Sequence, residues 1–593
     1  MATPVKRQYI NLAGVDFKNE ESLVELNRSP DALNVYINYE EEGNCIRTRP
    51  GYTKIAQFDG NINGMHMYNN TIMLVHAGTK LYLWDNFPSE PEDLEVLSDK
   101  MSDSKSVFFV FDKKLYINDG MNYLVYDGLL KNVAEDAFIP TTSIGRKPLG
   151  GGTMHQDVNV LQAKRINQFI GDGTSKDYYL DATEIDSIDS VYVNDIEVTD
   201  YTYSLILGRV SFNIAPTKPL LSGTDNVIIT YSKRASGYID RISKCTISQV
   251  FDNRVFFTGN PTYKNAIFHS ELNNPAYISD LSYYQDGTSD SAIKSITVGN
   301  NILWVFKEPN QKNATVFYHI PTTDHENGRI YPSKQGNVSI GCYAESINFS
   351  DDIVFLSKYG LEGINGDIEQ EQLLAHRSSL VDNKMINTNN FDKANMCEWK
   401  GYLLILVDKY IFLADSRQRY QSVSGIEYEW YLWDIENSKP SLLKELKGEL
   451  YIASKDGSIY KVEGTNDNGK TINSYWTTPM DAFGYSNVTK TTNKRGGVAK
   501  IKTMPNGIIK ISERTNKSNE KYITSKSLKG FDYSDLDYSN FSYTTTNDSY
   551  IVYKIKEKKF LTMSLKFYSD ELDKPFGLFS AVIEAFVGGY VKR

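Results

Sequence analysis

The stretch FDKKLYINDGMNYLVYDG, from Phe111 to Gly128, decides the fold of this chain. A polar turn precedes an alternating apolar run, and a second turn separates this run from another one. Alternation with a period of two residues is typical of half-buried strands, so the stretch predicts a β-hairpin. The same pattern occurs six more times along the 593 residues, which makes the hairpin the repeating unit of the fold.

The other copies lie on both sides of this hairpin. They are YNNTIMLVHAGTKLYLWD from Tyr68, FDNRVFFTGNPTYKNAIFHS from Phe251, VGNNILWVFKEPNQKNATVFYHI from Val298, FSDDIVFLSKYGLEGING from Phe349, WKGYLLILVDKYIFLADS from Trp399 and LKGELYIASKDGSIYKVEG from Leu446. Repeats of roughly 40–50 residues that are built from hairpins are the signature of propeller blades. We therefore expect an all-β chain with a β-propeller of about seven blades.

The spacing of the copies breaks once, between the copies that start at Phe111 and Phe251. The surplus sequence is a run of short strands separated by Gly, Asp and Asn turns, without a helical period. It predicts an inserted small β-sandwich domain at residues 150–234. Gly150–Gly152 and Ser236–Gly237 are the expected flexible joints on either side of it.

The repeats also set the remaining boundaries. Residues 1–50 are expected to form an N-terminal arm, in which the alternating stretch VYIN, with TKIAQF just after the arm, pairs with a blade edge. The blades then occupy residues 51–149 and 235–470. Residues 471–593 predict a C-terminal β-region that holds a Ser/Tyr/Asp-rich loop, KGFDYSDLDYSNFSYTTTND, and ends in an apolar, docked segment.

Composition narrows the classes of function. The formal net charge of −10 argues against tight, non-specific binding of nucleic acid, which needs a basic face. A mildly acidic channel would still let a polyanion slide through. The 41 tyrosines suit wet interfaces. The first residues lack the apolar core of a signal peptide, and no apolar run is long enough for a membrane helix, so we expect folding in a cytoplasm.

Three motifs have both a functional and a structural interpretation. SKDGSIY, from Ser454 to Tyr460, is similar to an Asp-box, but a hairpin turn of type I′ at Asp456-Gly457 is favoured. GDGTSKDYYLD, from Gly171 to Asp181, fits neither a phosphate loop nor an EF-hand, so we expect a turn between strands. The carboxylates of DALN and DATEIDSIDS offer possible calcium ligands, yet solvated loops are the favoured interpretation.

No motif predicts catalysis, a metal or a cofactor. The cysteines, Cys45, Cys245, Cys342 and Cys397, are far apart and predict buried, reduced thiols rather than a zinc site. His66 and His76 fall on adjacent strands of the first repeat, where a packed pair is favoured over a metal site. The other histidines are scattered: His155, His269, His319, His325 and His376. We predict that the chain is not an enzyme and has no catalytic, metal-binding or cofactor-binding residues.

Several segments together resemble a known family. They are SPDALNVYIN with RTRPGYTKI, DGTSKDYYLDATEIDSIDSVYVNDIEV, RVFFTGNPTYKNAIFHSELNNPAYISD with NILWVFKE, GCYAESINFSDDIVFLSKYGLEGI, and the C-terminal KFYSDELDKPFGLFSAVIEAFVGGYVKR. They resemble the propeller tail proteins of short-tailed bacteriophages, the tail nozzle or tail hub of the packaged-DNA stabilisation type.

The resemblance implies a structural protein of the virion tail that is assembled in the host cytoplasm. Its partners would be further copies of itself in a ring, most simply a homohexamer, together with a portal or adaptor ring and other tail proteins or fibres. Duplex DNA would pass through the channel without sequence-specific binding, and no membrane segment is implied. The ring would extend the portal channel, retain packaged DNA and conduct it during ejection.

Two alternatives stay open at this point. One is a carbohydrate-binding or receptor-recognition propeller of a tail spike or fibre, with tyrosines as platforms for sugars. A sugar-cleaving version needs two carboxyl groups about 5–9 Å apart. The other is a cellular propeller that acts as a monomeric platform for protein interactions.

Overall fold

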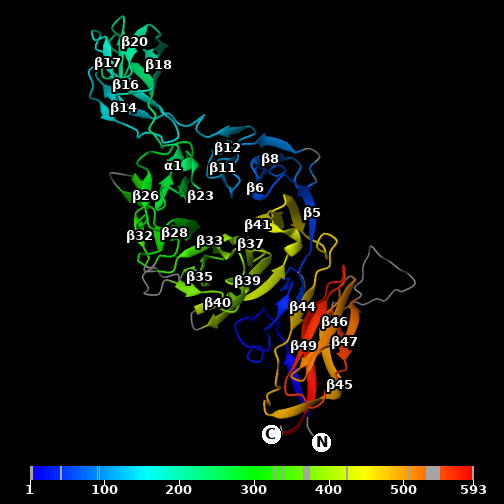
Figure 1. Cartoon of the computed structure of the whole chain (residues 1–593). Coiled ribbons are helices and arrows are strands. Elements are labelled where there is room, and N and C mark those ends of the chain that lie inside the picture. Colours follow the sequence, from blue (N-terminus) through cyan, green and yellow to red (C-terminus); the bar gives the residue numbers. More distant parts are fainter. Residues whose placement is uncertain are drawn as a thin grey trace. The chain divides into compact units, whose positions relative to one another are not determined.

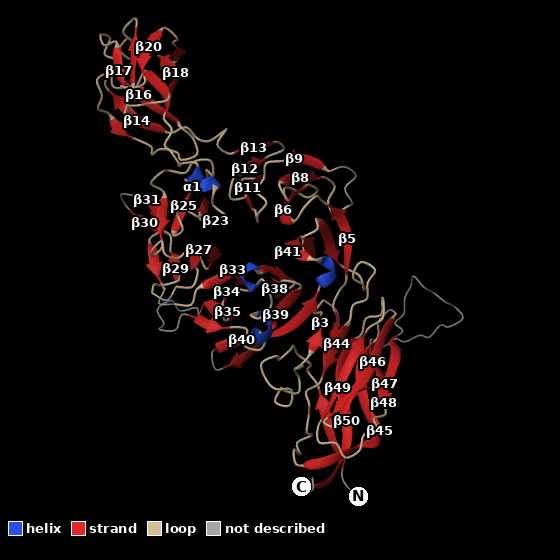
Figure 2. Cartoon of the chain, viewed as in Figure 1, coloured by secondary structure: helices blue, strands red, loops and turns tan. Residues whose placement is uncertain are grey.

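The computed structural model describes residues 4–40, 43–89, 91, 94–310, 312–324, 328–336, 339–364, 374–422, 425–504, 506–528 and 548–590. The chain is almost entirely β-structure (Figures 1 and 2). It divides into two compact units. We call them the terminal unit, residues 1–62, 88–91 and 342–593, and the central unit, residues 63–87 and 92–341. His325 and most of the Ser/Tyr/Asp-rich loop, 529–547, lie outside the described residues.

The described residues form seven four-stranded antiparallel sheets. Those of the central unit, which begin at the boundary residue Ile62, are β6 (Ile62–Met67), β7 (Met73–Ala77), β8 (Lys80–Trp84) and β9 (Glu95–Ser98); β10 (Val107–Phe111), β11 (Lys114–Asn118), β12 (Tyr123–Tyr126) and β13 (Leu130–Asn132); β23 (Ile247–Phe251), β24 (Arg254–Thr258), β25 (Ala266–His269) and β26 (Tyr283–Gln285); and β27 (Ile293–Gly299), β28 (Ile302–Lys307), β29 (Val316–His319) and β32 (Ser333–Gln335). A small hairpin joins the last two strands: β30 (Thr322–Asp324) and β31 (Gly328–Ile330).

The terminal unit holds the other three sheets. They are β33 (Cys342–Phe349), β34 (Asp352–Ser357), β35 (Gly360–Ile364) and β36 (Leu374–His376); β37 (Asn395–Trp399), β38 (Tyr402–Val407), β39 (Tyr410–Ser422) and β40 (Gly425–Asp434); and β41 (Pro440–Leu446), β42 (Glu449–Ser454), β43 (Ser458–Val462) and β5 (Tyr52–Gln57). The described residues also contain four short helices: α1 (Asp240–Ser243), α2 (Asp382–Met385), η1 (Phe391–Lys393) and η2 (Glu436–Ser438).

Each predicted hairpin supplies the two middle strands of one sheet, for example β11 and β12 from the stretch that starts at Phe111. The first strands of successive sheets contact each other, β10 with β23 and β23 with β27 in the central unit, and β33 with β37 and β37 with β41 in the terminal unit. Four-stranded meanders that pack through their first strands are propeller blades. The prediction of an all-β propeller fold is confirmed, and a closed ring of about seven blades stays a prediction.

Turn chemistry explains why the repeat folds in this way. In six sheets the first two strands are joined by two residues that both have positive φ. They are Asp112-Lys113, Asp252-Asn253, Asn300-Asn301, Ser350-Asp351, Lys400-Gly401 and Lys447-Gly448. This type I′ geometry matches the twist of the paired strands and is easiest for Gly, Asn and Asp.

The inserted domain consists of two sheets around a core of its own that includes Phe169, Tyr178 and Tyr231. Its strands are β14 (Thr141–Arg146), β15 (Thr153–Met154), β16 (Lys164–Phe169), β17 (Asp177–Tyr179), β18 (Ser187–Val193), β19 (Ile196–Glu197), β20 (Tyr201–Ser204), β21 (Arg209–Phe212) and β22 (Val227–Ser232). The domain begins earlier than the predicted residue 150, because β14 pairs with β16. Gly150–Gly152 therefore lie in a loop of the domain and not at its joint.

The segment between β15 and β16 returns to the neighbouring blade. Val160 and Leu161 are buried in the apolar cluster of that blade, and Asn159 Nδ2 donates to the carbonyl oxygens of Phe138 and Ala276, both at 2.9 Å. Residues inside the predicted domain boundaries thus belong to the propeller, which the strand pattern alone did not indicate.

The C-terminal β-region is a sandwich that the N-terminal arm completes. One sheet contains β3 (Val35–Ile37), β4 (Ile46–Thr48), β50 (Gly577–Tyr590), β45 (Val488–Lys502) and β48 (Asp548–Tyr553), with β1 (Pro4–Tyr9) on β50; the other contains β2 (Ala32–Leu33), β44 (Ser474–Thr477), β49 (Met563–Ser569), β46 (Gly507–Thr515) and β47 (Ser518–Leu528). TKIAQF pairs with a blade through β5, as predicted. VYIN does not, because β3 pairs with β4 in the sandwich.

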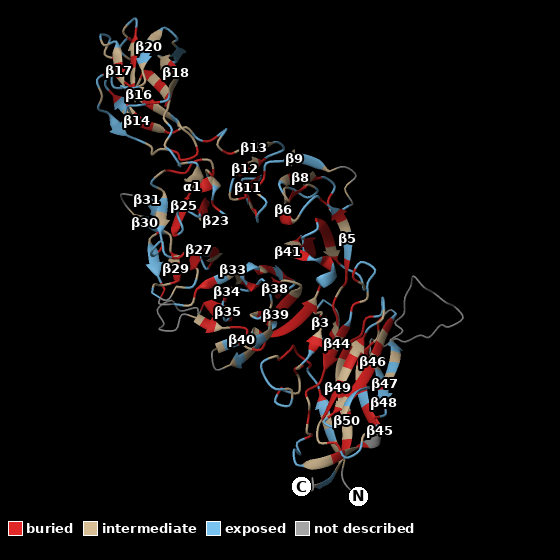
Figure 3. Cartoon of the chain, viewed as in Figure 1, coloured by how far each residue is buried: buried red, intermediate tan, exposed pale blue. Residues whose placement is uncertain are grey.

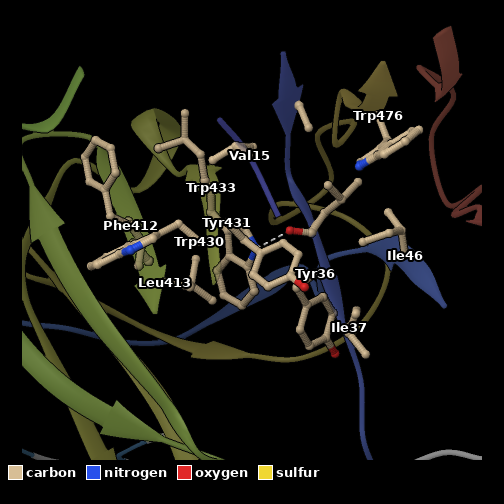
Figure 4. Packing of buried hydrophobic residues seen from close by; sticks show 14 of the residues in the cluster. Val15, Tyr36, Ile37, Ile46, Phe412, Leu413, Trp430, Tyr431, Trp433 and Trp476 are labelled. Carbon is tan, nitrogen blue, oxygen red and sulfur yellow. Dashed lines mark hydrogen bonds between the residues drawn. The ribbon is translucent and has the colours of Figure 1, made fainter. Parts of the chain in front are cut away.

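The arm packs directly on blade β37–β40, as Figure 4 shows. Trp433 Nε1 donates to the carbonyl oxygen of Val35 at 3.3 Å, and the rings of Tyr36 and Trp433 meet edge to face. Gly14 passes so close to Trp430 that an added Cβ would lie 2.0 Å from its carbonyl oxygen. The arm is therefore part of the core of the terminal unit, and the Trp-rich EWYLWD belongs to β40.

Candidate functional site

His376, at the end of β36, lies between two carboxylates, an arrangement that also occurs in catalytic sites. Its Nε2 donates to Asp382 Oδ2 at 2.6 Å and its Nδ1 donates to Glu362 Oε1 at 3.1 Å. Burial alone would lower the pKa of His376, but the hydrogen bonds to Asp382 and Glu362 raise it to about 10. An imidazolium held between two carboxylates has no free nitrogen to act as a base near neutral pH, so this cluster is an ion-pair network.

His319 forms a second network in the central unit. It is 1% exposed, donates from Nε2 to Asp286 Oδ2 at 3.0 Å and from Nδ1 to the carbonyl oxygen of Tyr331 at 2.8 Å. Burial opposes the charge, yet the hydrogen bond to Asp286 raises the pKa of His319. Lys307 Nζ donates to the carbonyl oxygens of Asp286 and Thr288, both at 2.7 Å. These groups are hydrogen-bonded to one another and to the backbone, which stabilises the fold.

The predicted histidine pair is divided between separate partners. Ser106 donates to His76 Nδ1 at 2.9 Å, whereas His66 bonds its own strand and stacks on Phe108. Across the described residues, no group of three or more His, Cys, Asp and Glu side chains is arranged to hold a metal ion. The four cysteines are buried thiols, as predicted.

The motif SKDGSIY is a hairpin turn between β42 and β43. Gly457 donates its N–H to the carbonyl oxygen of Ser454, and Asp456 Oδ1 accepts from the Ser458 N–H at 3.2 Å. Only Gly457 has positive φ, so the predicted type I′ geometry is wrong. The turn has Lys455 and Asp456 at its centre, and Gly457 follows them as a left-handed residue.

The other loop motifs also have structural roles. Asp172 accepts the N–H groups of Thr174 and Ser175 at 2.8 and 2.7 Å, which holds the predicted turn between β16 and β17. The Ser175 hydroxyl also donates to Asp172 Oδ2 at 2.6 Å, and this bond, followed by the two N–H bonds, lowers the pKa of Asp172. In DATEIDSIDS, Asp181 accepts from Thr142 and Tyr231. In DALN, Asp31 accepts from Tyr475 at 3.0 Å.

Three arginines of the arm are residues that sequence reasoning missed. Arg49 makes two bonds to Asp467, at 2.7 and 2.8 Å, and is 2% exposed. Arg28 binds Glu429 at 2.6 Å, and Arg7 binds Asp481. Each partner lies about 400 residues or more along the chain, so no local signal marks these pairs.

The most unusual surface is a loop of the inserted domain, residues 213–226, which joins β21 to β22. Its large apolar side chains face solvent: Leu220 is 100% exposed, Ile214 82% and Leu221 72%. Figure 3 shows that exposed residues are frequent in this domain. Single exposed apolar residues are ordinary, but several in one short loop make this loop a candidate surface for binding a partner.

This loop is held in place by hydrogen bonds. Asn226 is buried at its base, where Nδ2 donates to the Thr217 carbonyl oxygen at 2.8 Å and Oδ1 accepts the Gly171 N–H at 2.8 Å. Near the tip, the Thr224 hydroxyl donates to the carbonyl oxygen of Leu221 at 2.8 Å. The leucines are thus presented by a pre-organised turn, which lowers the entropy cost of binding.

A second feature is a cavity of about 410 Å³ in the terminal unit. Residues of the arm, of β39 and of β50 line it, and none of them is charged: Ile10, Asn11, Leu12, Ile37, Asn44, Cys45, Ile46, Gln418, Phe579 and Ser580. The exposed part of its wall is more polar than apolar, and its polar side chains include the amides Asn11, Asn44 and Gln418. Such a lining fits a neutral group that can form hydrogen bonds.

Comparisons with known proteins do not assign a function to the loop of residues 213–226 or to the cavity. No family description and no curated protein matches the chain. Among solved structures it is similar to the computationally designed Ika8 protein, with 11% identity over 70% of this chain and 99% of that one and a TM-score of 0.31. It is also similar to BamB from Moraxella catarrhalis, with 9% identity over 77% and 97% and a TM-score of 0.30. Hsv2p from Kluyveromyces lactis has 8% identity over 63% and 99% and a TM-score of 0.25.

Within the described parts of the chain, no helix has the length and apolarity needed to cross a membrane.

Proposed function

We propose that this chain is a structural subunit of a bacteriophage tail, where copies of it form the nozzle or hub ring. The ring would extend the portal channel, retain the packaged DNA and conduct it during ejection. Its neighbours would be the portal or adaptor ring above it and other tail proteins or fibres. The chain itself would have no catalytic role.

One observation carries this proposal: the ordered loop of the inserted domain presents Leu220 and Leu221 to solvent. The described ionisable clusters, in contrast, are occupied by ion pairs and hydrogen bonds inside the fold. A surface of this kind supports an assembly protein rather than an enzyme. The net charge of −10 supports weak, non-adhesive contact with DNA.

Cryo-electron microscopy of virions tests the proposal. A tag inserted at Gly151, where an added Cβ meets no atom within 4 Å, marks the position of the chain. We expect tagged density in a rotationally symmetric ring, in line with the DNA axis. Tags on single copies in peripheral fibres, or release of sugar from polysaccharide by the pure chain, would overturn the proposal.

A further inference from the structure

We propose that four lysines of the C-terminal sandwich bind the phosphate backbone of duplex DNA. They directly follow β48 and their side chains are exposed: Lys554, Lys556, Lys558 and Lys559. We call them the lysine row. The choice of DNA rests on the proposed function, in which DNA passes through a ring of this chain, whereas the row itself is a feature of the fold.

Charge is distributed unevenly along the chain. Residues 471–593 contain 19 Lys and Arg against 12 Asp and Glu, a net charge of +7, whereas residues 1–470 carry a net charge of −17. The total of −10 therefore averages a basic region and an acidic one. Non-specific contact with DNA depends on a local basic face, and the C-terminal sandwich provides it.

The ammonium groups of the lysine row are available to a ligand. Within the described parts of the chain, none of the four lysines forms an ion pair, whereas the nearby Lys521 pairs with Glu557 at 2.5 Å. Glu557 is the only carboxylate between the first and last lysines of the row, and Lys521 already neutralises it. A phosphate group can therefore approach the row without breaking an ion pair of the fold.

The backbone of the row is fixed by its buried neighbours. Ile555 is 2% exposed and Phe560 is fully buried. The Thr492 hydroxyl donates to the carbonyl oxygen of Ile555 at 2.7 Å, and the backbones of Phe560 and Lys490 exchange two hydrogen bonds, at 2.7 and 3.0 Å. The lysines thus project from a segment that is ordered before it binds, which reduces the entropy cost of binding.

The chemistry of the row favours phosphates over a lipid surface. Tyr550 and Val552 on β48 are 60% and 63% exposed, but the apolar side chains next to the lysines, Ile555 and Phe560, are buried. The segment therefore lacks the broad apolar face that enters a lipid interface. A lysine ammonium is a compact point charge that binds phosphate oxygens without a fixed geometry, as contact with DNA of any sequence requires.

Fluorescence anisotropy of a labelled duplex of mixed sequence, titrated with the full chain, tests the proposal. Four phosphate contacts predict that the logarithm of the binding constant falls with the logarithm of the salt concentration with a slope of about −3.6, or about 100-fold between about 50 and about 200 mM salt. We expect the slope to become shallower by about 3–4 in the variant that combines Lys554→Gln, Lys556→Gln, Lys558→Gln and Lys559→Gln.

A control variant changes the net charge by the same amount elsewhere. It replaces four exposed lysines of the central unit: Lys164→Gln, Lys176→Gln, Lys218→Gln and Lys334→Gln. This variant should keep the salt dependence of the parent chain. Equal losses in the two variants would show that the overall charge, and not the row, governs binding, and would overturn the proposal.

Footprinting of the unaltered chain gives a second measurement that no substitution can disturb. Acetylation of lysines, read by mass spectrometry, should be slower at the row when the duplex is present and unchanged at Lys334. Failure of the duplex to bind at low salt or to protect the row would overturn the proposal. Binding of the row to vesicles of anionic phospholipid but not to DNA, or row-dependent self-association in sedimentation without DNA binding, would do the same.

The failure of this inference and of the proposed function are distinguishable. An axial ring in virions, formed by a chain whose row does not bind DNA, would overturn the role of the row and leave the nozzle proposal standing. Row-dependent DNA binding by a chain that is found on peripheral fibres would retain the row and overturn the nozzle.

Discussion

The inserted domain and the C-terminal sandwich are both two-sheet β-structures, but their strands come from differently placed segments of the chain. The inserted domain uses one continuous stretch and packs a core from residues 169–231. The C-terminal sandwich needs strands from both ends of the chain, since β1 to β4 complete its sheets. The first is closed by local contacts, whereas the second depends on contacts between residues hundreds of positions apart.

The two regions also differ in how much of their apolar surface is buried. In the C-terminal sandwich the arm covers the apolar side chains, and Trp476, Phe567 and Ile583 are buried. The inserted domain buries its core but leaves Leu220 and Leu221 exposed. The arm therefore covers the apolar surface of the sandwich, whereas the inserted domain buries a core of its own and still exposes two leucines.

The largest effect is expected from deletion of chain segments in each of the two regions. Deletion of residues 1–48 removes four strands from the terminal unit, so we expect an aggregated protein without a cooperative thermal transition. Replacement of residues 164–232 by a short Gly/Ser linker removes every strand of the inserted domain except β14 and β15, and it should leave a soluble protein that unfolds cooperatively. Circular dichroism melting and sedimentation measure both outcomes.

The second deletion has a favourable geometry. The Lys233 N–H donates to the carbonyl oxygen of Ala163 at 3.0 Å, so the two ends already touch, and Val160 and Leu161 remain in the blade core. A deletion that also removes residues 157–161 is the control and should be less stable. If the two deletions behave alike, the segment that returns to the blade is unimportant.

The next largest effect is expected at the buried ion pair between Arg49 and Asp467. Arg49→Ala leaves Asp467 buried without its partner, which costs about 3–5 kcal/mol in the free energy of unfolding. Urea denaturation followed by tryptophan fluorescence measures this change. Arg209→Ala in the inserted domain is the control: Arg209 lies 3.7 Å from a half-exposed Asp177, so its effect should be far smaller. Equal effects would contradict the expectation that the buried Arg49–Asp467 pair stabilises the terminal unit.

A smaller, pH-dependent effect is expected at Glu513 in β46. Burial and the neighbouring Glu557 raise the pKa of Glu513 to about 7. The folded state therefore binds this proton more tightly than the unfolded state, and stability falls as the pH rises from about 4.5 to about 7. Glu513→Gln should raise the free energy of unfolding by about 1 kcal/mol at pH 8, after allowance for solvent screening, and change little at pH 4.

Thermal melting of Glu513→Gln and the parent chain across this pH range provides the measurement. Asp172→Asn in the inserted domain is the opposite case, since hydrogen bonds lower the pKa of Asp172 and its contribution is lost as the pH falls through the acidic range. A stabilisation by Glu513→Gln that is equal at pH 4 and pH 8 would show that charge is not the cause.

The smallest effect on stability is expected at the exposed loop. Leu220→Ser removes a side chain that contacts no core, so the free energy of unfolding should change by less than about 0.5 kcal/mol. Val210→Ser, at a buried position of the same domain, is the control and should be strongly destabilising. A destabilisation of similar size in both variants would mean that the loop leucines belong to the core.

The sequence alone determined the repeating hairpins, because a strand needs only alternation and a tight turn needs only residues that tolerate positive φ. FDKKLYIND shows both: β10 ends at Phe111, Asp112 and Lys113 turn, and β11 begins at Lys114. The inserted domain was also visible as a break in spacing, although its start at Thr141 was not. Local chemistry carries all of these signals.

Only the tertiary structure decided where the arm goes and which surfaces remain exposed. Arg49 pairs with Asp467, and Val35 accepts a hydrogen bond from Trp433. The partners are hundreds of residues apart, and no local sequence pattern indicates either contact. The leucines of PLLSG are as apolar as those of a strand, yet Leu220 is exposed while Leu413 is fully buried. Burial depends on which surfaces the folded chain brings together, and no other described part of the chain covers Leu220.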